Sequence, residues 1–146
     1  MKEDKTTKKE ALQALVAVLR KWQGIEDGSV ALTTSVIGKT KNPLIRLVME
    51  IIQQDSVMHK KVQQAILDSL ETEAFRLQPE ELAEIWDMLE KHDQAEKEAI
   101  RLAEEAKANC PLIIQRQLLE YLIEDEKKHD RLMGNLEDLK RGIYPY

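Results

Sequence analysis

Residues 119–136, with the sequence LEYLIEDEKKHDRLMGNL, carry the pattern that decides the fold. Apolar side chains recur there at the three-and-four spacing of one helix face, at Leu119, Leu122, Met133 and Leu136. Between them lie an acid and an imidazole three residues apart, Glu126 and His129, on the same face. The stretch therefore predicts a helix that turns two ligand-type side chains toward the interior of a helical protein.

The chain repeats this pattern seventy residues earlier. When residues 10–70 are set against residues 80–140 without a gap, 11 of the 61 positions are identical. The identical pairs include polar residues of unusual placement: Glu26 and Glu96, Asp55 and Asp125, His59 and His129. Shared helix composition does not explain why these polar residues recur at constant spacing. We therefore interpret the chain as an internally duplicated helical hairpin.

Four helices are expected from the apolar stripes and from the Pro and Asn residues that interrupt them. Their predicted bounds are residues 10–38, 43–70, 80–108 and 111–141. A flexible basic tail at residues 1–9 and a short tail at residues 142–146 flank the helices. The expected fold class is all-α, a four-helix bundle built from two duplicated helical hairpins that form one domain.

Composition excludes several classes of protein. With 22 Lys and Arg against 27 Asp and Glu, the net charge is -5, and this argues against a nucleic-acid partner. No segment approaches the roughly 18 uninterrupted apolar residues of a membrane span, and the N-terminal residues lack the apolar core of a signal peptide. We expect no membrane partner and a cytoplasmic location. The single cysteine, Cys110, excludes an internal disulfide and a Cys-rich zinc site.

Five ligand-type side chains fall on the apolar rows near the middle of the expected helices. They are Glu26, His59, Glu96, Glu126 and His129. Burying several carboxylates close together is costly unless a cation compensates their charge. Oxygen and nitrogen ligands suit iron and also manganese. We expect iron, as two ions or one, with manganese as the other candidate and no haem. The catalytic residues are not assigned.

This arrangement resembles the rubrerythrin-like branch of the ferritin-like di-iron carboxylate proteins over residues 10–140. Those bundles take one Glu from each of two helices and a Glu-x-x-His motif from each of the other two. The resemblance implies that Glu26 and His59 hold one ion, that Glu96 and His129 hold the other, and that Glu126 bridges them. Ser56 stands where the second bridging Glu is expected, three residues before His59.

Three further residues are candidates around this site. Asp55 and Asp125 each precede a histidine by four residues, and a carboxylate commonly orients a metal-bound imidazole. By resemblance Asp125 supports His59 and Asp55 supports His129; the alternative is two solvated aspartates. His92 lies one turn from Glu96 on the same row and is a further candidate ligand. An imidazole bonded to a neighbouring group is the alternative role for His92.

The resemblance implies a non-haem iron protein, with oxidase, peroxidase or ferroxidase chemistry if two ions are present. The alternative is a degenerate or metal-free bundle that acts as an oligomeric structural or interaction protein. We expect a homo-oligomer, with a dimer favoured, and an external electron donor if the protein is redox-active. Restoring the missing acid by Ser56→Glu is expected to bring the number of ions toward two.

Topology adds a condition. In ferritin-like folds the second and third helices run parallel, so their connection must travel the length of the bundle. A chain spans at most about 3.3–3.6 Å per residue when extended, against 1.5 Å in a helix. The crossover therefore requires the second helix to stop near Ile66 and the third to begin well after Leu77. Two long helices would favour an up-down-up-down bundle or a swapped dimer.

Overall fold

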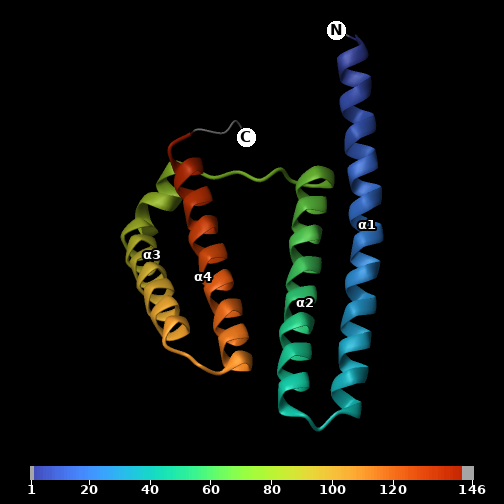
Figure 1. Ribbon diagram of the computed structural model, residues 1–146. Helices are drawn as coiled ribbons and strands as arrows, with labels where there is room; N and C mark the ends of the chain where they lie inside the picture. The colour runs from blue at the N-terminus through green and yellow to red at the C-terminus, as the bar shows by residue number, and fades with distance from the viewer. Residues whose placement is uncertain (1, 143–146) are drawn as a thin grey trace. The chain divides into compact units, whose positions relative to one another are not determined.

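The computed structural model describes residues 2–142, and these residues are helical apart from short connections. The four helices are α1 (Lys2–Lys39), α2 (Pro43–Glu71), α3 (Pro79–Ala108) and α4 (Ile113–Lys140). Helix α1 packs on α2, and α3 packs on α4 (Figure 1). We call these pairs hairpin 1 and hairpin 2. The predicted all-α class with two helical hairpins is confirmed.

The helix bounds agree with the predicted ones to within two residues except at the N-terminus. Helix α1 begins at Lys2, so the backbone of residues 2–9 is helical where a flexible tail was expected. These residues include Lys and Glu, which are good helix formers, and contain no Gly or Pro to interrupt the helix. Of the predicted C-terminal tail, residues 143–146 lie outside the described residues.

Hairpin 1 is closed by a turn whose residues end one helix and begin the next. The Asn42 side chain accepts hydrogen bonds from the backbone N–H groups of Leu44 (2.9 Å) and Ile45 (3.2 Å). Pro43 occupies the first turn of α2, where its missing N–H costs nothing. Arg46 donates to the carbonyl of Ile37 at the end of α1 (2.9 Å). These bonds fix the two helices of hairpin 1 as antiparallel neighbours.

Hairpin 2 begins at a helix start and is held by ion pairs between its helices. The backbone N–H of Gln78 donates to the Glu81 carboxylate (3.0 Å), an acid in the first turn of α3. Lys107 of α3 forms an ion pair with Glu120 of α4.

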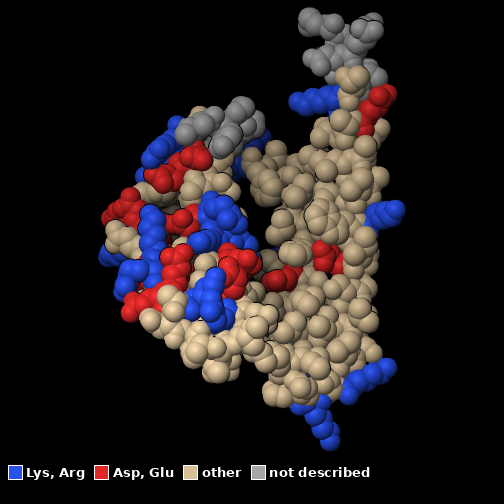
Figure 2. Space-filling model, in the orientation of Figure 1, with Lys and Arg blue, Asp and Glu red and all other residues tan. Residues whose placement is uncertain are grey.

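The visible face of hairpin 2 is densely charged, whereas that of hairpin 1 shows few charges (Figure 2). On the face shown, hairpin 2 thus carries more charged side chains than hairpin 1.

One interhelical ion pair of hairpin 1 occupies positions whose equivalents in hairpin 2 carry the opposite charges. Lys60 of α2 lies 2.7 Å from Asp27 of α1. The positions seventy residues later hold Lys97 on α3 and Asp130 on α4. The carboxylates of Asp93, at 2.8 Å, and of Asp130 raise the pKa of Lys97. The cation therefore sits on the second helix of hairpin 1 and on the first helix of hairpin 2.

Polar side chains take an unusual share of the buried positions. The buried apolar residues are Leu19 and Leu67 in hairpin 1 and Leu82 and Ile123 in hairpin 2. The buried polar residues are Gln23, Glu26, Thr33, Ser56 and Gln63 in hairpin 1 and Glu96 in hairpin 2. Buried polar groups must find partners or lose stability. Among the described residues, buried polar side chains therefore outnumber buried apolar ones in hairpin 1, and Glu96 is the buried polar residue of hairpin 2.

The connection between the hairpins is too short for the crossover of a ferritin-like chain. Helix α2 runs to Glu71 and α3 begins at Pro79, so the condition stated from the sequence is not met. The eight Cα steps from Glu71 to Pro79 reach about 28 Å at most. Helix α2, with 29 residues, is about 44 Å long. The connection is therefore shorter than helix α2.

None of the helices in residues 2–142 combines the length and the apolar character that crossing a membrane requires.

Candidate metal centre

Hairpin 2 brings together three of the predicted metal ligands. Glu96 comes from α3, and Glu126 and His129 come from α4, where their spacing of three residues places them on one face. Each offers a ligand atom, and these atoms lie within 4.8 Å of one another. Two carboxylates and one imidazole are thus converged from two helices, as the sequence predicts.

Glu96 is the buried member of this cluster. Its side chain is 7% exposed, and its Oε2 atom is buried with no hydrogen-bond partner among the described residues. The other oxygen, Oε1, lies 2.7 Å from Nε2 of His92 and 3.4 Å from Nδ1 of His129. A buried carboxylate oxygen without a donor is costly. A cation between Glu96, Glu126 and His129 would remove this cost, so the residues fit a metal ion.

The two carboxyl groups of the cluster depend on one another. When it is protonated, Glu126 can donate a hydrogen bond to Glu96, and this bond, together with burial, raises the pKa of Glu126 above its ordinary value. The same hydrogen bond lowers the pKa of Glu96, and the charges of His129 and His92 lower it further. As pH falls, a proton therefore binds Glu126 before Glu96, and a metal ion would compete with that proton.

Stability of the metal-free protein should consequently depend on pH. Because folding raises the pKa of Glu126, its proton favours the folded state below the ordinary Glu pKa, and that contribution is lost as pH rises through the raised value. Glu126→Gln keeps a neutral hydrogen-bond donor at every pH. In chelator, we expect its melting temperature to exceed that of wild type at pH 7.5 and the difference to vanish toward pH 4.5. An equal difference at both pH values would contradict the raised pKa of Glu126.

His92 lies outside the three-residue cluster and contacts only its Glu96 member. Its imidazole is 61% exposed and 2.7 Å from the Glu96 carboxylate. This geometry supports the alternative reading from the sequence, an imidazole bonded to a neighbouring group, over direct ligation. His92 can then orient Glu96, as outer-sphere partners of metal ligands do.

The two predicted supporting aspartates differ in what they contact. Asp125 lies 2.6 Å from the Lys128 ammonium and 3.7 Å from Nε2 of His129, a histidine of its own helix. Asp55 is half-buried. The expected pairs, Asp125 with His59 and Asp55 with His129, each join the two hairpins and stay predictions.

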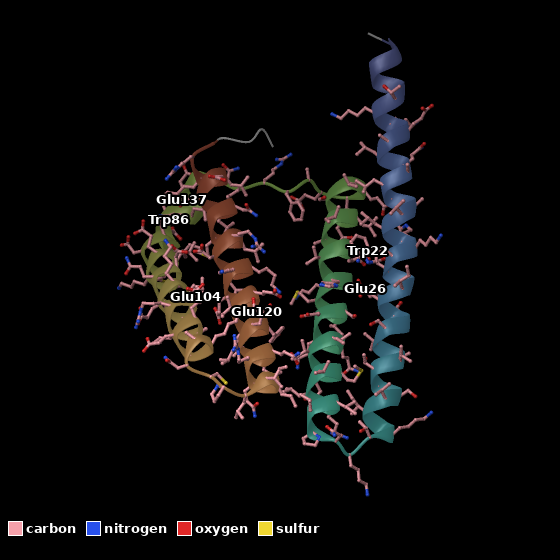
Figure 3. The ribbon with its side chains drawn as sticks, viewed as in Figure 1. Trp22, Glu26, Trp86, Glu104, Glu120 and Glu137 are labelled. Atoms are coloured by element: carbon pink, nitrogen blue, oxygen red, sulfur yellow. The ribbon has the colours of Figure 1, made fainter. Side chains whose placement is uncertain are left out.

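Hairpin 1 brings Glu26 and His59 together but adds no third ligand. Glu26, labelled on α1 in Figure 3, has a side chain that is 7% exposed and lies 3.3 Å from Nδ1 of His59. Ser56 is buried, and its hydroxyl is 2.9 Å from that of Ser29. Among the side chains that the structure describes, the cluster of hairpin 2 is the one group of three or more acids and imidazoles with metal-ligand spacing. Hairpin 1 thus offers two of the ligands expected by resemblance.

Sequence reasoning missed Gln63. This residue is 3% exposed, and its Nε2 atom lies 3.4 Å from Oε1 of Glu26. A signal was present, because Gln63 follows Ser56 by seven residues and its equivalent in the second half is the apolar Met133. Sequence reasoning also missed a second carboxyl pair, in which Asp93 raises the pKa of Asp130 through a hydrogen bond.

The chain was compared with known proteins on the basis of both sequence and structure. No protein family, curated protein or solved structure matches it.

Proposed function

We propose that this protein binds one divalent transition-metal ion per chain in hairpin 2, through Glu96, Glu126 and His129. The observation that carries the proposal is the buried Glu96 oxygen that meets no donor beside a second carboxylate and an imidazole. Two adjacent carboxylates form a site that favours a dication, because its charge compensates the repulsion between them.

Iron and manganese suit this ligand set best, since two carboxylates and one imidazole are mostly hard oxygen donors. Three protein ligands leave positions for water or a small molecule. Bound Fe(II) would supply electrons to O2 or peroxide, and an external donor protein would then be needed for turnover. The residues themselves would fix the ion: Glu96 from its buried position, Glu126 and His129 from adjacent turns of α4. A cytoplasmic location is part of this proposal.

The resemblance to rubrerythrin-like proteins remains a proposal, and the helix bounds restrict the ways in which a two-ion centre could form. A two-ion centre in the ferritin-like order would need α2 and α3 to run parallel, and the connection of Thr72–Gln78 is too short for this within one chain. The two hairpins of such a centre would have to come from different copies. Exposed apolar side chains on both hairpins, such as Ile25 (63%) and Met88 (70%), support a homodimer.

A metal-free interaction protein is the competing function. The observation that favours it is the number of large apolar side chains left exposed along the helices, including Val18, Leu32 and Leu132. Surfaces of this kind commonly bind other proteins. In that case the buried acids are satisfied by protons and hydrogen bonds alone, and the protein binds no ion.

Metal analysis separates these functions. The purified chain, loaded anaerobically with Fe(II) or Mn(II) and freed of excess ion, should retain one ion per chain. Glu126→Gln should lower the affinity at least about 10-fold, because it removes a charged ligand. Glu124→Gln is the matched control, since Glu124 is exposed on the same helix two residues away. Retention of no ion by the wild type would leave the interaction protein as the better description.

A further inference from the structure

The two hairpins hold equivalent buried acids in different surroundings. Glu26 and Glu96 occupy equivalent positions, and each is 6% exposed. Glu96 keeps a buried oxygen without a donor, whereas Glu26 has no such atom among the described residues. The partners of Glu26 are the Gln63 amide at 3.4 Å and the His59 imidazole at 3.3 Å. Both contacts are made to the same oxygen, Oε1, so this oxygen of Glu26 has partners without a cation.

The difference between the hairpins at position 56 is accompanied by a second difference on the facing helix. Ser56 stands where hairpin 2 has Glu126, and the residue that it bonds, Ser29, stands where hairpin 2 has Ala99. Their hydroxyl groups are 2.9 Å apart. A serine at either position alone would leave a half-buried hydroxyl without this partner. The serine that replaces the acid is thus accompanied by a second serine on the facing helix, which gives it a hydrogen-bond partner.

The orientation of the Gln63 amide toward Glu26 leaves the amide carbonyl without a hydrogen-bond donor among the described residues. Its carbonyl atom Oε1 is buried and has no donor in the described chain. The opposite orientation of the amide would place that carbonyl against the Glu26 carboxylate, two acceptors face to face. The amide N–H is the stronger requirement, because hydrogen bonds to a charged acceptor are worth more than those between neutral groups.

We infer that Gln63 takes the place of a metal ion as the buried partner of Glu26, so that hairpin 1 is a metal-free half and the chain holds one ion. Gln63 thereby determines metal stoichiometry. Contrary to the expectation from the sequence, Ser56→Glu alone should not create a second site, because the Gln63 amide still occupies Oε1 of Glu26. The part of this inference that concerns ion number rests on the proposed function; the part that concerns Glu26 and Gln63 does not.

The first test measures melting temperature in chelator, where no metal contributes. Gln63→Glu is isosteric, removes the donor and sets a second carboxylate beside Glu26. It should lower the melting temperature by about 6 °C or more. Gln53→Glu adds the same charge on the same helix, where the side chain is hydrogen-bonded to Thr34 (2.7 Å) with no acid as partner, and should change it by less than about 2 °C.

A second variant, which adds no buried charge, tests the same contact if Gln63→Glu does not fold. Gln63→Met installs the residue found at the equivalent position of hairpin 2 and adds no charge. It should lower the melting temperature in chelator by about 3–6 °C through the lost hydrogen bond to Glu26. A value equal to wild type for Gln63→Met, or equal values for Gln63→Glu and Gln53→Glu, would overturn the inference whether or not the protein binds metal.

The second test counts Mn(II) ions per chain after anaerobic loading of folded protein. Wild type and Ser56→Glu should each hold one, and Ser56→Glu combined with Gln63→Met should hold two. Two ions in Ser56→Glu alone, or one ion in the folded double variant, would show that Gln63 does not set the number. No ion in wild type would refute the proposed function, and the chelator measurements would still decide the role of Gln63.

Discussion

Replacing His129 by alanine is expected to lower the affinity for Mn(II) or Fe(II) by at least about 100-fold. His129 supplies the one nitrogen ligand of the cluster with Glu96 and Glu126. Changes to outer-sphere partners of metal ligands already cost about 10–100-fold, and removal of a ligand should cost more. The affinity can be measured by titration against a competing chelator of known strength under anaerobic conditions.

The internal duplication provides the control for this experiment. His59 occupies the equivalent position in hairpin 1 and lies at a similar distance from its own buried acid, 3.3 Å from Glu26 against 3.4 Å for His129 and Glu96. His59→Ala should therefore leave the affinity within about twofold, because hairpin 1 lacks a third ligand. Equal losses in the two variants would favour a centre that uses both histidines, as the ferritin-like resemblance implies.

The second large effect is on stability. A ligand that binds only the folded state at 1,000 times its dissociation constant stabilises the protein by about 4 kcal/mol. For a chain of 146 residues this corresponds to a rise in melting temperature of about 8–16 °C. We expect this rise on adding Mn(II) to chelator-treated protein, with complete reversal by excess chelator.

The rise should disappear when the acids of the cluster are neutralised. Glu96→Gln combined with Glu126→Gln keeps hydrogen-bonding groups at both positions and removes both charges, so the metal should no longer change the melting temperature. The double variant Glu105→Gln with Glu124→Gln carries the same charge change at exposed positions of α3 and α4. A full metal response in the first double variant would exclude the cluster as the site.

Much of the fold follows from local patterns in the sequence. The seven-residue rows of apolar side chains and the breaks at Asn42 and Pro111 predict the helices, and the structure reproduces them. The convergence of Glu96, Glu126 and His129 was equally accessible, because residues three apart share a helix face and duplication places the acid of α3 opposite them. Local spacing determines these features.

Other features depend on contacts that spacing does not specify. The sequence does not predict the role of Gln63, because a glutamine on an apolar row can be exposed or buried. Its hydrogen bond to Glu26 depends on how α1 and α2 pack. At Ser56 the sequence shows only that an expected Glu is missing, since it does not show that Ser29 faces Ser56. The helical start at Lys2 reflects residues that are compatible with both helix and tail.

The exchange of charges between the positions of Asp27 and Lys60 and those of Lys97 and Asp130 bears on how a chain with an internal repeat selects its own helix partners. After a duplication, each helix has two candidate partners of the same shape, the original and its copy. If α1 paired with α4, Asp27 would oppose Asp130; if α3 paired with α2, Lys97 would oppose Lys60. The correct hairpins place opposite charges together, whereas the exchanged ones place like charges together. A surface feature of modest strength therefore biases the nascent chain against shuffling its two halves.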